Sequence, residues 1–261
     1  MTASTAVGVE RLADGVVLVE LRRPPHNYFD VPLITALADL YAQLDGDTAV
    51  RAIVLASEGR NFCAGANFGG DGDRTEAITT DVAGSLYAQG VRLFSVGTPV
   101  VAAVQGIAIG GGLGLAVSAD FRVAGPATRF SANFSRLGLH QGFGLSVSLP
   151  RVVGRQHALD MLLTGRRVGA EEALRFGLAD RLAATDDGIR ADAVALATEI
   201  AAAAPLAVRS IRATQKAGLA EEVAAITAHE AAEQLWLRGT ADFTEGVAAS
   251  LERRAPRFTG S

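Results

Sequence analysis

The segment that most constrains the fold is residues 99–120, PVVAAVQGIAIGGGLGLAVSAD. Its apolar run Pro99–Val104 is long enough for one buried strand. Three consecutive glycines, Gly110–Gly112, then form a turn, and the small apolar residues after them predict a helix that stops before Asp120. This order leaves backbone N–H groups exposed at the positive end of a helix. Such a turn binds an anion or a developing oxyanion, or only lets a helix pack closely on a strand. The segment alone leaves both interpretations open.

Short strands and helices alternate over most of the chain. Residues 16–21 and 52–56 are apolar and β-branched, which is typical of buried strands. Asp30 is placed to cap a helix that carries a stripe of apolar residues. The alternation predicts an α/β fold with a mostly parallel sheet and helical crossovers. From residue 188 the sequence is rich in alanine and predicts helices only.

Composition excludes several classes of protein. The chain is 49% hydrophobic and 20% charged, which is typical of a folded domain. Its net charge of −4 and its lack of a long basic run argue against nucleic acid as a partner. The single cysteine, Cys63, excludes an internal disulfide and fits a reducing compartment. No signal peptide is visible, and no apolar run approaches the ~18 residues of a membrane span. We therefore expect a cytoplasmic protein without a membrane partner.

Several common kinds of site are absent from the sequence. The histidines have no spacing typical of metal ligands, so no metal is expected; they are His26, His140, His157 and His229. Neither a G-x-S-x-G elbow nor a P-loop occurs. Gly110, Gly112 and Gly114 form part of a dinucleotide-binding pattern, but no acidic residue follows at the spacing that this pattern needs.

A second glycine-rich loop accompanies the first. Residues 62–68, FCAGANF, follow the predicted strand 52–56, just as the triple glycine follows the strand in 99–104. If the two strands share a parallel sheet, both loops lie at its carboxyl edge, where α/β folds bind ligands. Two backbone N–H groups that converge there would form an oxyanion hole.

At this point the sequence resembles a known family. The segments RNFCAGANF and PVVAAVQGIAIGGGLGLAVSADFRVA resemble the signature of the crotonase superfamily, the enoyl-CoA hydratase/isomerase family. The shorter segments LRRPPHN and SRLGL also match, as do LPRVVGRQHALDMLLTGRRVGAEEALRFGLADRL and FTEGVAASLERRAPRFTG. The resemblance keeps the family's order of motifs from about residue 16 to the C-terminus.

The resemblance implies an α/β, crotonase-like spiral of ββα units in residues 1–195. It implies that residues 196–261 form a helical region that assembles homotrimers or dimers of trimers. The implied partner is an acyl-CoA thioester, with no cofactor other than the coenzyme A of the substrate.

Site residues follow from the resemblance by position. The oxyanion-hole donors would be the N–H groups of Ala66 and Gly111. The positions that match contacts with coenzyme A or substrate are His26, Tyr28, Ala64, Asn67, Phe68, Phe134 and Leu137. Asn67 replaces the aspartate of the family's GAD motif, and the RPP turn is about one residue shorter than in the family.

The resemblance breaks at the two catalytic acids. Hydratases of this family use two glutamates to hold and activate water, and the matching positions here are Gly114 and Phe134. Neither side chain can donate or accept a proton, although acid–base hydration requires such groups. Some isomerases of the family use only the second glutamate as their base, and Phe134 stands at that position here.

His140 is the candidate for a replacement base, because an ordinary histidine titrates near ~6.5 and suits proton transfer at neutral pH. It lies in the loop SRLGLHQG, and the alternative is a histidine that only supports the structure. Gln141 and Asn133 could donate hydrogen bonds but could not act as bases. Asp71 and Asp73 lie in a glycine-rich loop and are weaker candidates for the chemistry.

Three further residues have simpler interpretations. We expect Asp120 to have a structural role, either as a helix cap or in an ion pair. Arg136 is expected to carry a solvated charge rather than to bind phosphate. Cys63 is expected to fill buried space.

Two functions follow from these residues. The first, which we prefer, is an acyl-CoA-processing enzyme that stabilises a thioester enolate and uses a non-standard base. Hydration, double-bond isomerisation and carbon–carbon cleavage all remain open for it. The second is a non-catalytic acyl-CoA-binding protein that kept the hole and lost the carboxylates.

Overall fold

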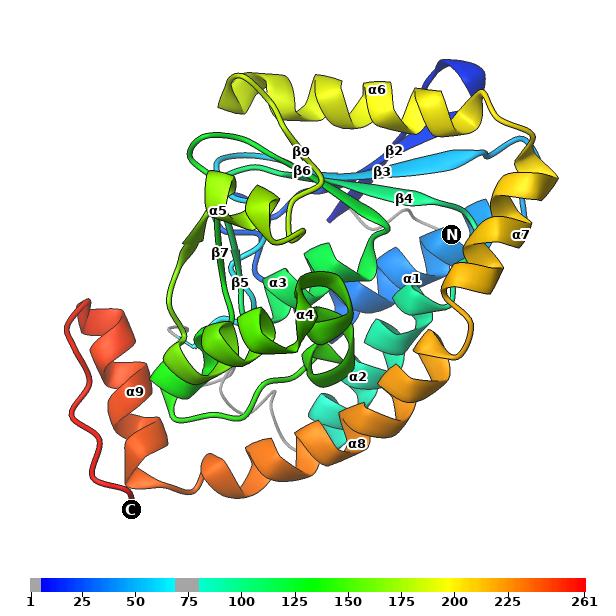
Figure 1. Cartoon of the computed structure of the whole chain (residues 1–261). Helices are drawn as coiled ribbons and strands as arrows, with labels where there is room; N and C mark the ends of the chain where they lie inside the picture. The colour runs from blue at the N-terminus through cyan, green and yellow to red at the C-terminus, as the bar shows by residue number, and fades with distance from the viewer. Residues whose placement is uncertain (1–5, 69–79) are drawn as a thin grey trace.

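The computed structural model describes residues 6–68 and 80–261 (Figure 1). Asp71 and Asp73 lie outside the described residues. The strands are β1 Val7–Arg11, β2 Val16–Leu21, β3 Ala52–Ser57, β4 Val100–Val104, β5 Ile107–Ile109, β6 Phe121–Ala124, β7 Arg129–Ser131, β8 Val168–Gly169 and β9 Arg181–Leu182. The α-helices are α1 Val31–Asp45, α2 Thr80–Phe94, α3 Gly111–Ser118, α4 Leu145–Thr164, α5 Ala170–Arg175, α6 Ile189–Ala201, α7 Pro205–Gln215, α8 Leu219–Leu237 and α9 Ala241–Glu252. Short 3₁₀ turns are η1 Ala13–Gly15, η3 Asn133–Leu137 and η4 Asp186–Gly188.

The larger sheet has the strand order β1-β2-β3-β4-β6-β9. All of its pairs are parallel except β1 with β2. Strands β3 and β4 are neighbours, with Ile53 opposite Val100. The loop after β3 and the glycine turn beyond β4 therefore leave the sheet at the same edge, as predicted from the order of the motifs.

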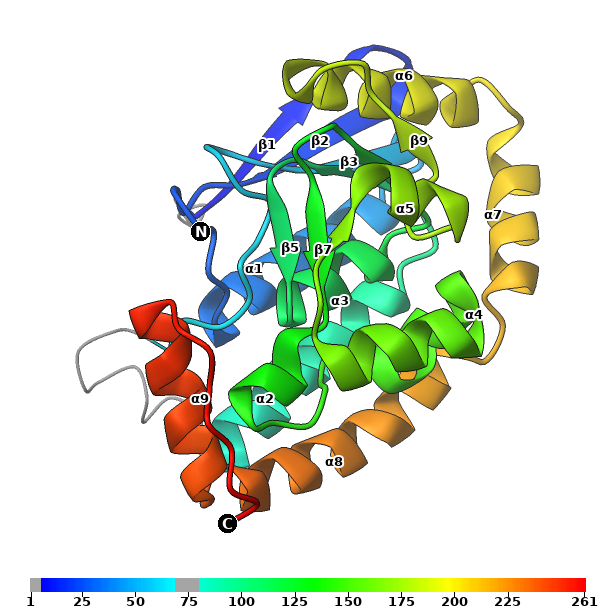
Figure 2. The same cartoon turned by 60° about the vertical axis from the view of Figure 1, so that its left-hand side comes forward.

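A smaller sheet, β5-β7-β8, carries the glycine turn. Figure 2 shows β5 and β7 running steeply away from β2 and β3 and ending above α3. Cys63 forms an isolated parallel bridge with Ala108 in β5. This bridge ties the first glycine-rich loop to the strand that leads into the second.

The two faces of the larger sheet bury alternate residues of each strand, as the period of two in a strand requires. Val17 and Ile53 belong to the main core, which also contains buried residues of α1 and α3. Their neighbours Val16 and Ala52 face a second core built with α6. Figure 1 shows α6 across one face of the sheet, with α1 and α3 on the opposite side. Because both faces are covered, every residue of the central strands β3 and β4 is buried.

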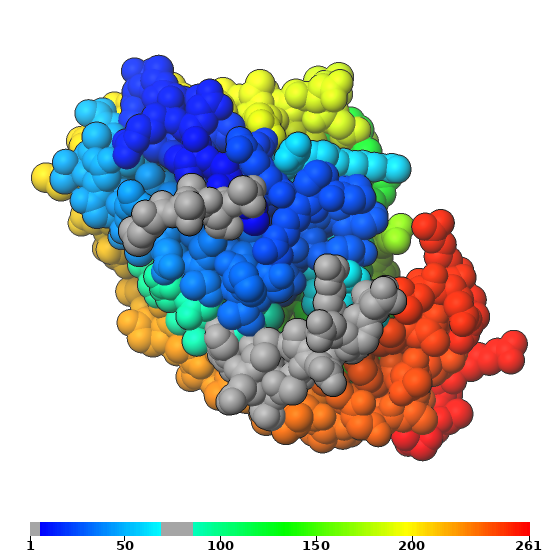
Figure 3. All heavy atoms as spheres, turned by 180° about the vertical axis from the view of Figure 1, so that it is seen from behind, coloured from blue at the N-terminus to red at the C-terminus, as the bar shows by residue number. Residues whose placement is uncertain are grey.

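The last helices wrap around the outside of the core. Helix α8 packs on α2 and α4, and α9 packs on η3. Figure 3 shows α9 and the C-terminal tail, in red, at one side of the molecule. The expected boundary between residues 195 and 196 falls within α6, and the division into a core and an oligomerisation region stays a prediction.

Helix starts follow the local sequence, whereas some strands do not. Asp30 caps α1, and its side chain accepts from the N–H of Leu33 at 2.9 Å. Strand β1 was not predicted, because its last three residues are exposed and its sequence VGVER lacks an apolar run. Strand β5 is only three residues long, IAI, and leads directly into the glycine turn. Helix α4 is interrupted at Gly154, which has φ +78°.

Among the described residues, no single helix has the length and apolar character needed to cross a bilayer. Only the pair Asp186–Ala201 and Pro205–Gln215, taken together and bent by 106° at its break, reaches that length and composition.

Candidate active site

The two glycine-rich loops meet beside β5. Cys63 donates its N–H to the carbonyl of Ile107 at 3.0 Å and accepts from the N–H of Ile109 at 3.1 Å. Gly65 has φ +77°, and a Cβ built there would lie 2.7 Å from the Ile109 carbonyl oxygen and 3.4 Å from the nitrogen of Gly111. The residue before Ala66 is thus in direct contact with the start of α3.

The backbone N–H groups of Ala66 and Gly111 form what we call the donor pair. Gly110 begins α3 as its N-cap, and its own N–H donates to Ser131 at 2.8 Å. Within residues 6–68 and 80–261, neither N–H of the donor pair has a protein acceptor. The N–H of Gly111 also carries the partial positive charge of a helix N-terminus. Two such donors can bind a carbonyl oxygen and stabilise negative charge on it.

Gly112 permits the close approach of the two loops. A Cβ at this position would overlap the carbonyl oxygen of Cys63 and lie 2.8 Å from its carbonyl carbon. Because both groups belong to a backbone held by hydrogen bonds, they have little freedom to move. The triple glycine is therefore both a packing device and the source of a free donor, so the two interpretations of this segment are compatible.

Three phenyl rings surround the glycine turn. A Cβ at Gly111 would overlap the ring of Phe29, and one at Gly110 would lie 3.8 Å from Cζ of Phe134. The rings of Phe29 and Phe143 have their centroids 5.4 Å apart. Apolar walls lower the local dielectric and strengthen hydrogen bonds made within them.

The turn after β2 joins the loop after β3. The rings of His26 and Tyr28 lie 5.2 Å apart, and the N–H of Ala64 donates to the carbonyl of His26 at 3.0 Å. Asn27 is fully buried, and its amide donates to the carbonyls of Glu58 at 2.8 Å and Asn61 at 2.6 Å. The structure therefore brings together three of the predicted contact residues, held by Asn27.

Two further predicted contacts, Phe68 and Leu137, lie against α9. The ring of Phe68 is 6.2 Å from that of Phe243 in an edge-to-face arrangement. Leu137 is buried, and its backbone lies against Gly246, whose added Cβ would be 2.6 Å from the carbonyl carbon of Leu137. Asn67 is half-buried in the same loop as Phe68.

No side chain fits at residue 114 while Phe143 keeps its place. A Cβ on Gly114 would lie 2.8 Å from Cδ1 and 2.9 Å from Cβ of Phe143. The ring thus occupies the space next to Gly114, where the resemblance places the first acid. At the second acid position, Phe134 presents an apolar ring to the glycine turn.

His140 lies against α8. Its Nδ1 is 2.8 Å from the carbonyl oxygen of Gln141, and its ring is 5.7 Å from that of His229. Its carbonyl accepts from the side chain of Gln234 at 2.9 Å. In the described part of the chain, no contact joins the His140 ring to the donor pair.

Asp120 has the structural role expected of it. Its carboxylate accepts from the N–H of Val100 at 2.8 Å and pairs with Arg212 and Lys216, each at 2.9 Å. Burial acts to raise the pKa of Asp120, but the two cations and their hydrogen bonds hold it below its usual value.

The other candidates are also engaged within the fold. Arg136 is exposed and donates to the carbonyl of Thr164 at 2.7 Å. Gln141 donates to the hydroxyl of Ser146 at 3.0 Å. Cys63 is buried, and burial raises the pKa of its thiol to about 12, so it is an inert filler as predicted. Asn133 has its amide oxygen next to Gly110, 3.2 Å from where a Cβ would be.

Three residues near the site were not identified from the sequence: Phe29, Phe143 and Glu230. The carboxylate of Glu230, on α8, accepts from the N–H groups of Gly144 at 2.8 Å and Ser146 at 3.0 Å. Nothing local in the helical sequence around Glu230 indicates this role. For Phe143, the sequence signal is the glycine on each side of it, which is typical of a turn.

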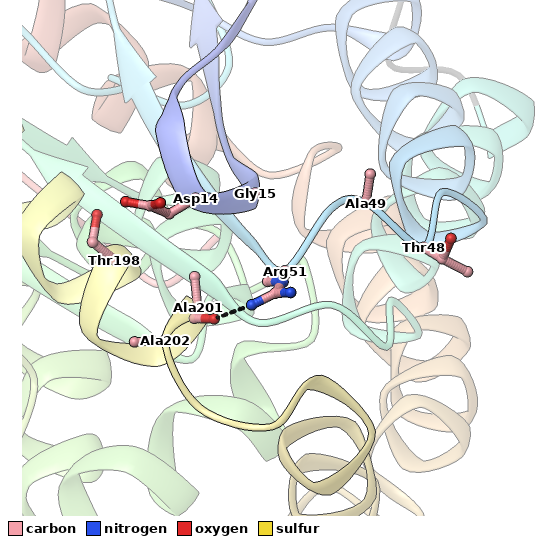
Figure 4. Close-up of a pocket in the computed structure, with 8 residues that line it drawn as sticks. All are labelled: Asp14, Gly15, Thr48, Ala49, Arg51, Thr198, Ala201 and Ala202. Carbon is pink, nitrogen blue, oxygen red and sulfur yellow. Dashed lines mark hydrogen bonds between the residues drawn. The ribbon is translucent and has the colours of Figure 1, made fainter.

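Two surface hollows lie away from the donor pair. One, of about 620 Å³, opens between η1 and the end of α6, where Arg51 donates to the carbonyl of Ala201 at 3.1 Å (Figure 4). The other, of about 770 Å³, lies between α9 and the C-terminal tail. Among the described residues, no group of three or more His, Cys, Asp or Glu side chains is arranged to hold a metal ion.

Comparison with known proteins decides the family. A family model described as "Enoyl-CoA hydratase/isomerase" matches residues 11–261. The chain belongs to the enoyl-CoA hydratase/isomerase family. Among its relatives are the "Probable enoyl-CoA hydratase echA12" of Mycobacterium bovis, 37% identical, and echA6 of the same organism, 36% identical. The first match covers 96% of this chain and 92% of the relative, and the second covers 95% and 98%.

Solved structures of the family confirm the crotonase fold. An enoyl-CoA hydratase/isomerase from Pseudoalteromonas atlantica T6c superposes with a TM-score of 0.83 at 31% identity, covering 98% of this chain and all of that one. An enoyl-CoA hydratase from Mycobacterium avium subsp. paratuberculosis K-10 gives a TM-score of 0.83 at 29% identity, covering 98% and 99%. The fold predicted from the resemblance is therefore confirmed.

Proposed function

We propose that this protein binds acyl-CoA thioesters and stabilises an enolate-like charge on the thioester oxygen. The observation that carries this proposal is the donor pair of Ala66 and Gly111, two backbone N–H groups without a protein acceptor in the described residues. The relatives named as enoyl-CoA hydratases support a thioester as the ligand. One donor of this kind typically contributes about 2.7–4 kcal/mol to lowering a reaction barrier.

The rest of the ligand follows the outer side of the same loops. We assign the coenzyme A portion to His26, Tyr28 and Ala64, together with Asn67 and Phe68. The contact of the His26 ring with Tyr28 and the bond from Ala64 to the His26 carbonyl support one continuous surface. No cofactor other than this coenzyme A is needed, because the donor pair itself supplies the electrostatic stabilisation.

The proposed reaction is of the hydratase/isomerase type, with His140 as a non-standard base. Imidazole is the side chain that most often transfers protons in general acid–base catalysis. The loop that carries His140 continues directly into Gly142 and Phe143, which abuts Gly114. This continuity is the structural support for the assignment.

A second function, non-catalytic binding of acyl-CoA, is favoured by one observation. Phe143 fills the space next to Gly114, and Phe134 presents an apolar ring at the other acid position. A site with donors and no carboxylate holds a thioester without supplying acid–base groups. In this alternative the protein sequesters or delivers acyl-CoA.

The C-terminal helices carry exposed apolar side chains that suit self-assembly. Helices α7 and α8 expose large apolar side chains, with Leu206 82%, Ile211 64% and Trp236 59% accessible. We propose that residues 196–261 use such side chains to form a homotrimer or a dimer of trimers.

Replacing the thioester by a thioether tests the donor pair without altering the protein. We expect butanoyl-CoA to bind about tenfold or more tighter than S-butyl-CoA, because the thioether lacks the oxygen that accepts two hydrogen bonds. Isothermal titration calorimetry measures both affinities, with free coenzyme A as the reference. Equal affinities would remove the donor pair from the proposal. Liquid chromatography with mass spectrometry after incubation with crotonyl-CoA then separates an enzyme, which forms a hydrated or isomerised product, from a binding protein, which forms none.

The His140→Ala variant tests the base. We expect turnover to fall by about 100-fold or more, a typical value for loss of a general base, while the affinity for butanoyl-CoA stays unchanged. The matched control is His229→Ala, which removes the imidazole that packs on His140 from α8. Equal rates in the wild type and in His140→Ala would exclude His140 from the mechanism.

A further inference from the structure

Phe143 has an unusual backbone conformation for a large side chain. Its φ is +61°, in the left-handed region, and it stands between Gly142 and Gly144. A bulky residue rarely adopts positive φ, because its Cβ crowds the backbone. Such outliers persist where the surrounding structure holds them, and they concentrate at functional sites. A glycine would occupy this position without strain, so local backbone geometry does not account for a phenylalanine here.

The ring of Phe143 packs against α3, the helix that begins at the donor pair. It lies against Gly114 and Phe29, and its Cε2 is 3.1 Å from where a Cβ on Gly90 of α2 would be. Residues three apart share one face of a helix, so Gly114 follows Gly111 on the same side of α3. The ring therefore stands one helical turn beyond the N–H that faces the proposed thioester oxygen.

The turn that carries Phe143 is held from outside by α8. Glu230 is fully buried, and its carboxylate accepts from the N–H of Gly144 and from the N–H and hydroxyl of Ser146 at 2.6–3.0 Å. Burial raises the pKa of Glu230, and these hydrogen bonds oppose that effect by stabilising the carboxylate. Gln234, one turn further along α8, donates to the carbonyl of His140. The backbone on both sides of the ring is thus bonded to the same helix.

We propose that Phe143 ends the acyl pocket, so that the site takes short acyl chains, and that Glu230 is its positioning residue. A chain attached to a thioester at the donor pair and directed past Gly114 meets the phenyl ring within one helical turn. The proposal rests on the proposed function, because it requires the thioester oxygen to lie at Gly111. If the ring had only a structural role, its removal would lower the stability of the protein without changing the preference for acyl-chain length.

The test compares butanoyl-CoA with dodecanoyl-CoA by isothermal titration calorimetry on the full chain. We expect the wild type to bind butanoyl-CoA at least about tenfold tighter, since a closed apolar pocket discriminates by roughly tenfold or more per misfitted group. In Phe143→Ala this ratio of affinities falls by at least about tenfold, mainly because dodecanoyl-CoA binds better. The matched control is Phe176→Ala; this ring directly follows α5 and stacks on His157 with the centroids 4.6 Å apart. Its ratio stays at the wild-type value.

Two further variants keep the test decisive. If Phe143→Ala does not fold, Phe143→Leu retains most of the apolar volume and shifts the ratio in the same direction by a smaller factor. Glu230→Gln preserves shape and removes the charge that holds the turn, and it also lowers the ratio. An unchanged ratio in Glu230→Gln would overturn the positioning role.

The outcomes separate this inference from the proposed function. If the folded wild type binds neither acyl-CoA, both the proposed function and the acyl-pocket assignment are wrong. If it binds both acyl-CoAs equally, or if the ratio is unchanged in every folded Phe143 variant, thioester binding stands and Phe143 does not end the pocket.

Discussion

Replacing Gly112 with alanine is expected to destabilise the protein by about 3 kcal/mol, at the upper end for overpacking, and to abolish thioester binding. The added methyl group would overlap the carbonyl oxygen of Cys63. That carbonyl accepts from the N–H of Ile109, and the N–H of Cys63 donates to the carbonyl of Ile107. Cys63 therefore cannot move without breaking its hydrogen bonds to β5. The overlap of the methyl group with this carbonyl can be relieved only if the loop before Ala66 moves away from α3. The donor pair is then separated, which removes the proposed function together with the stability.

Urea denaturation and titration with butanoyl-CoA measure the two effects in Gly112→Ala. The matched control is Gly169→Ala, because Gly169 has φ −80° and a Cβ there would lie no nearer than 3.9 Å to Nη1 of Arg129. We expect this control to keep both the stability and the affinity of the wild type. Normal binding by a stable Gly112→Ala protein would show that the contact between the loops is not required for the donor pair.

Replacing Asp120 with alanine is expected to cost about 3–5 kcal/mol of unfolding free energy, typical of breaking a buried ion pair by removing one partner. The carboxylate is largely buried and pairs with Arg212 and Lys216 of the α7 region. It also accepts from the N–H of Val100 at the start of β4. Without it, two cations and one N–H lose their partner in a place with little water.

The pH dependence of stability distinguishes this cause from simple loss of packing. The pKa of Asp120 in the folded protein lies below its usual value of 3.8. Its contribution is therefore complete above the unfolded pKa and is lost as the pH falls below about 4 through the folded pKa. We expect wild-type stability to fall in that range and the loss from Asp120→Ala to shrink with it.

The control for Asp120→Ala is an exposed pair. Glu199 contacts Arg181 at 2.7 Å, and its side chain is 61% exposed, so Glu199→Ala is expected to leave the free energy of unfolding nearly unchanged. Equal losses in the two variants, measured by urea denaturation at pH 7, would contradict the importance that we assign to burial of Asp120.

Local sequence predicted much of the fold because the relevant signals act over a few residues. The strand at 16–21, the cap at Asp30 and the helix after Gly110 all depend on neighbouring residues, and all are present. Strand β1 was missed because an edge strand needs no apolar alternation when its partner supplies the hydrogen bonds.

For the candidate site too, one part could be predicted from the sequence and another part could not. The two glycine-rich loops could be predicted to meet, since parallel strands bring their following loops to one edge. What surrounds them depends on contacts between distant residues. Phe143 lies on Gly114, and Glu230 bonds to Gly144 across 86 residues. No local pattern contains that information.

The two glycine-rich loops, Gly114 and Phe134 can all be read from the sequence, because each is a matter of residue type at a short spacing. What lies beside Gly114 depends on the tertiary structure. The ring of Phe143 fills that space, and a carboxylate on α8 holds its turn. The physical reason is that a backbone N–H is available wherever local conformation exposes it, whereas the volume around it is set by side chains from the whole fold.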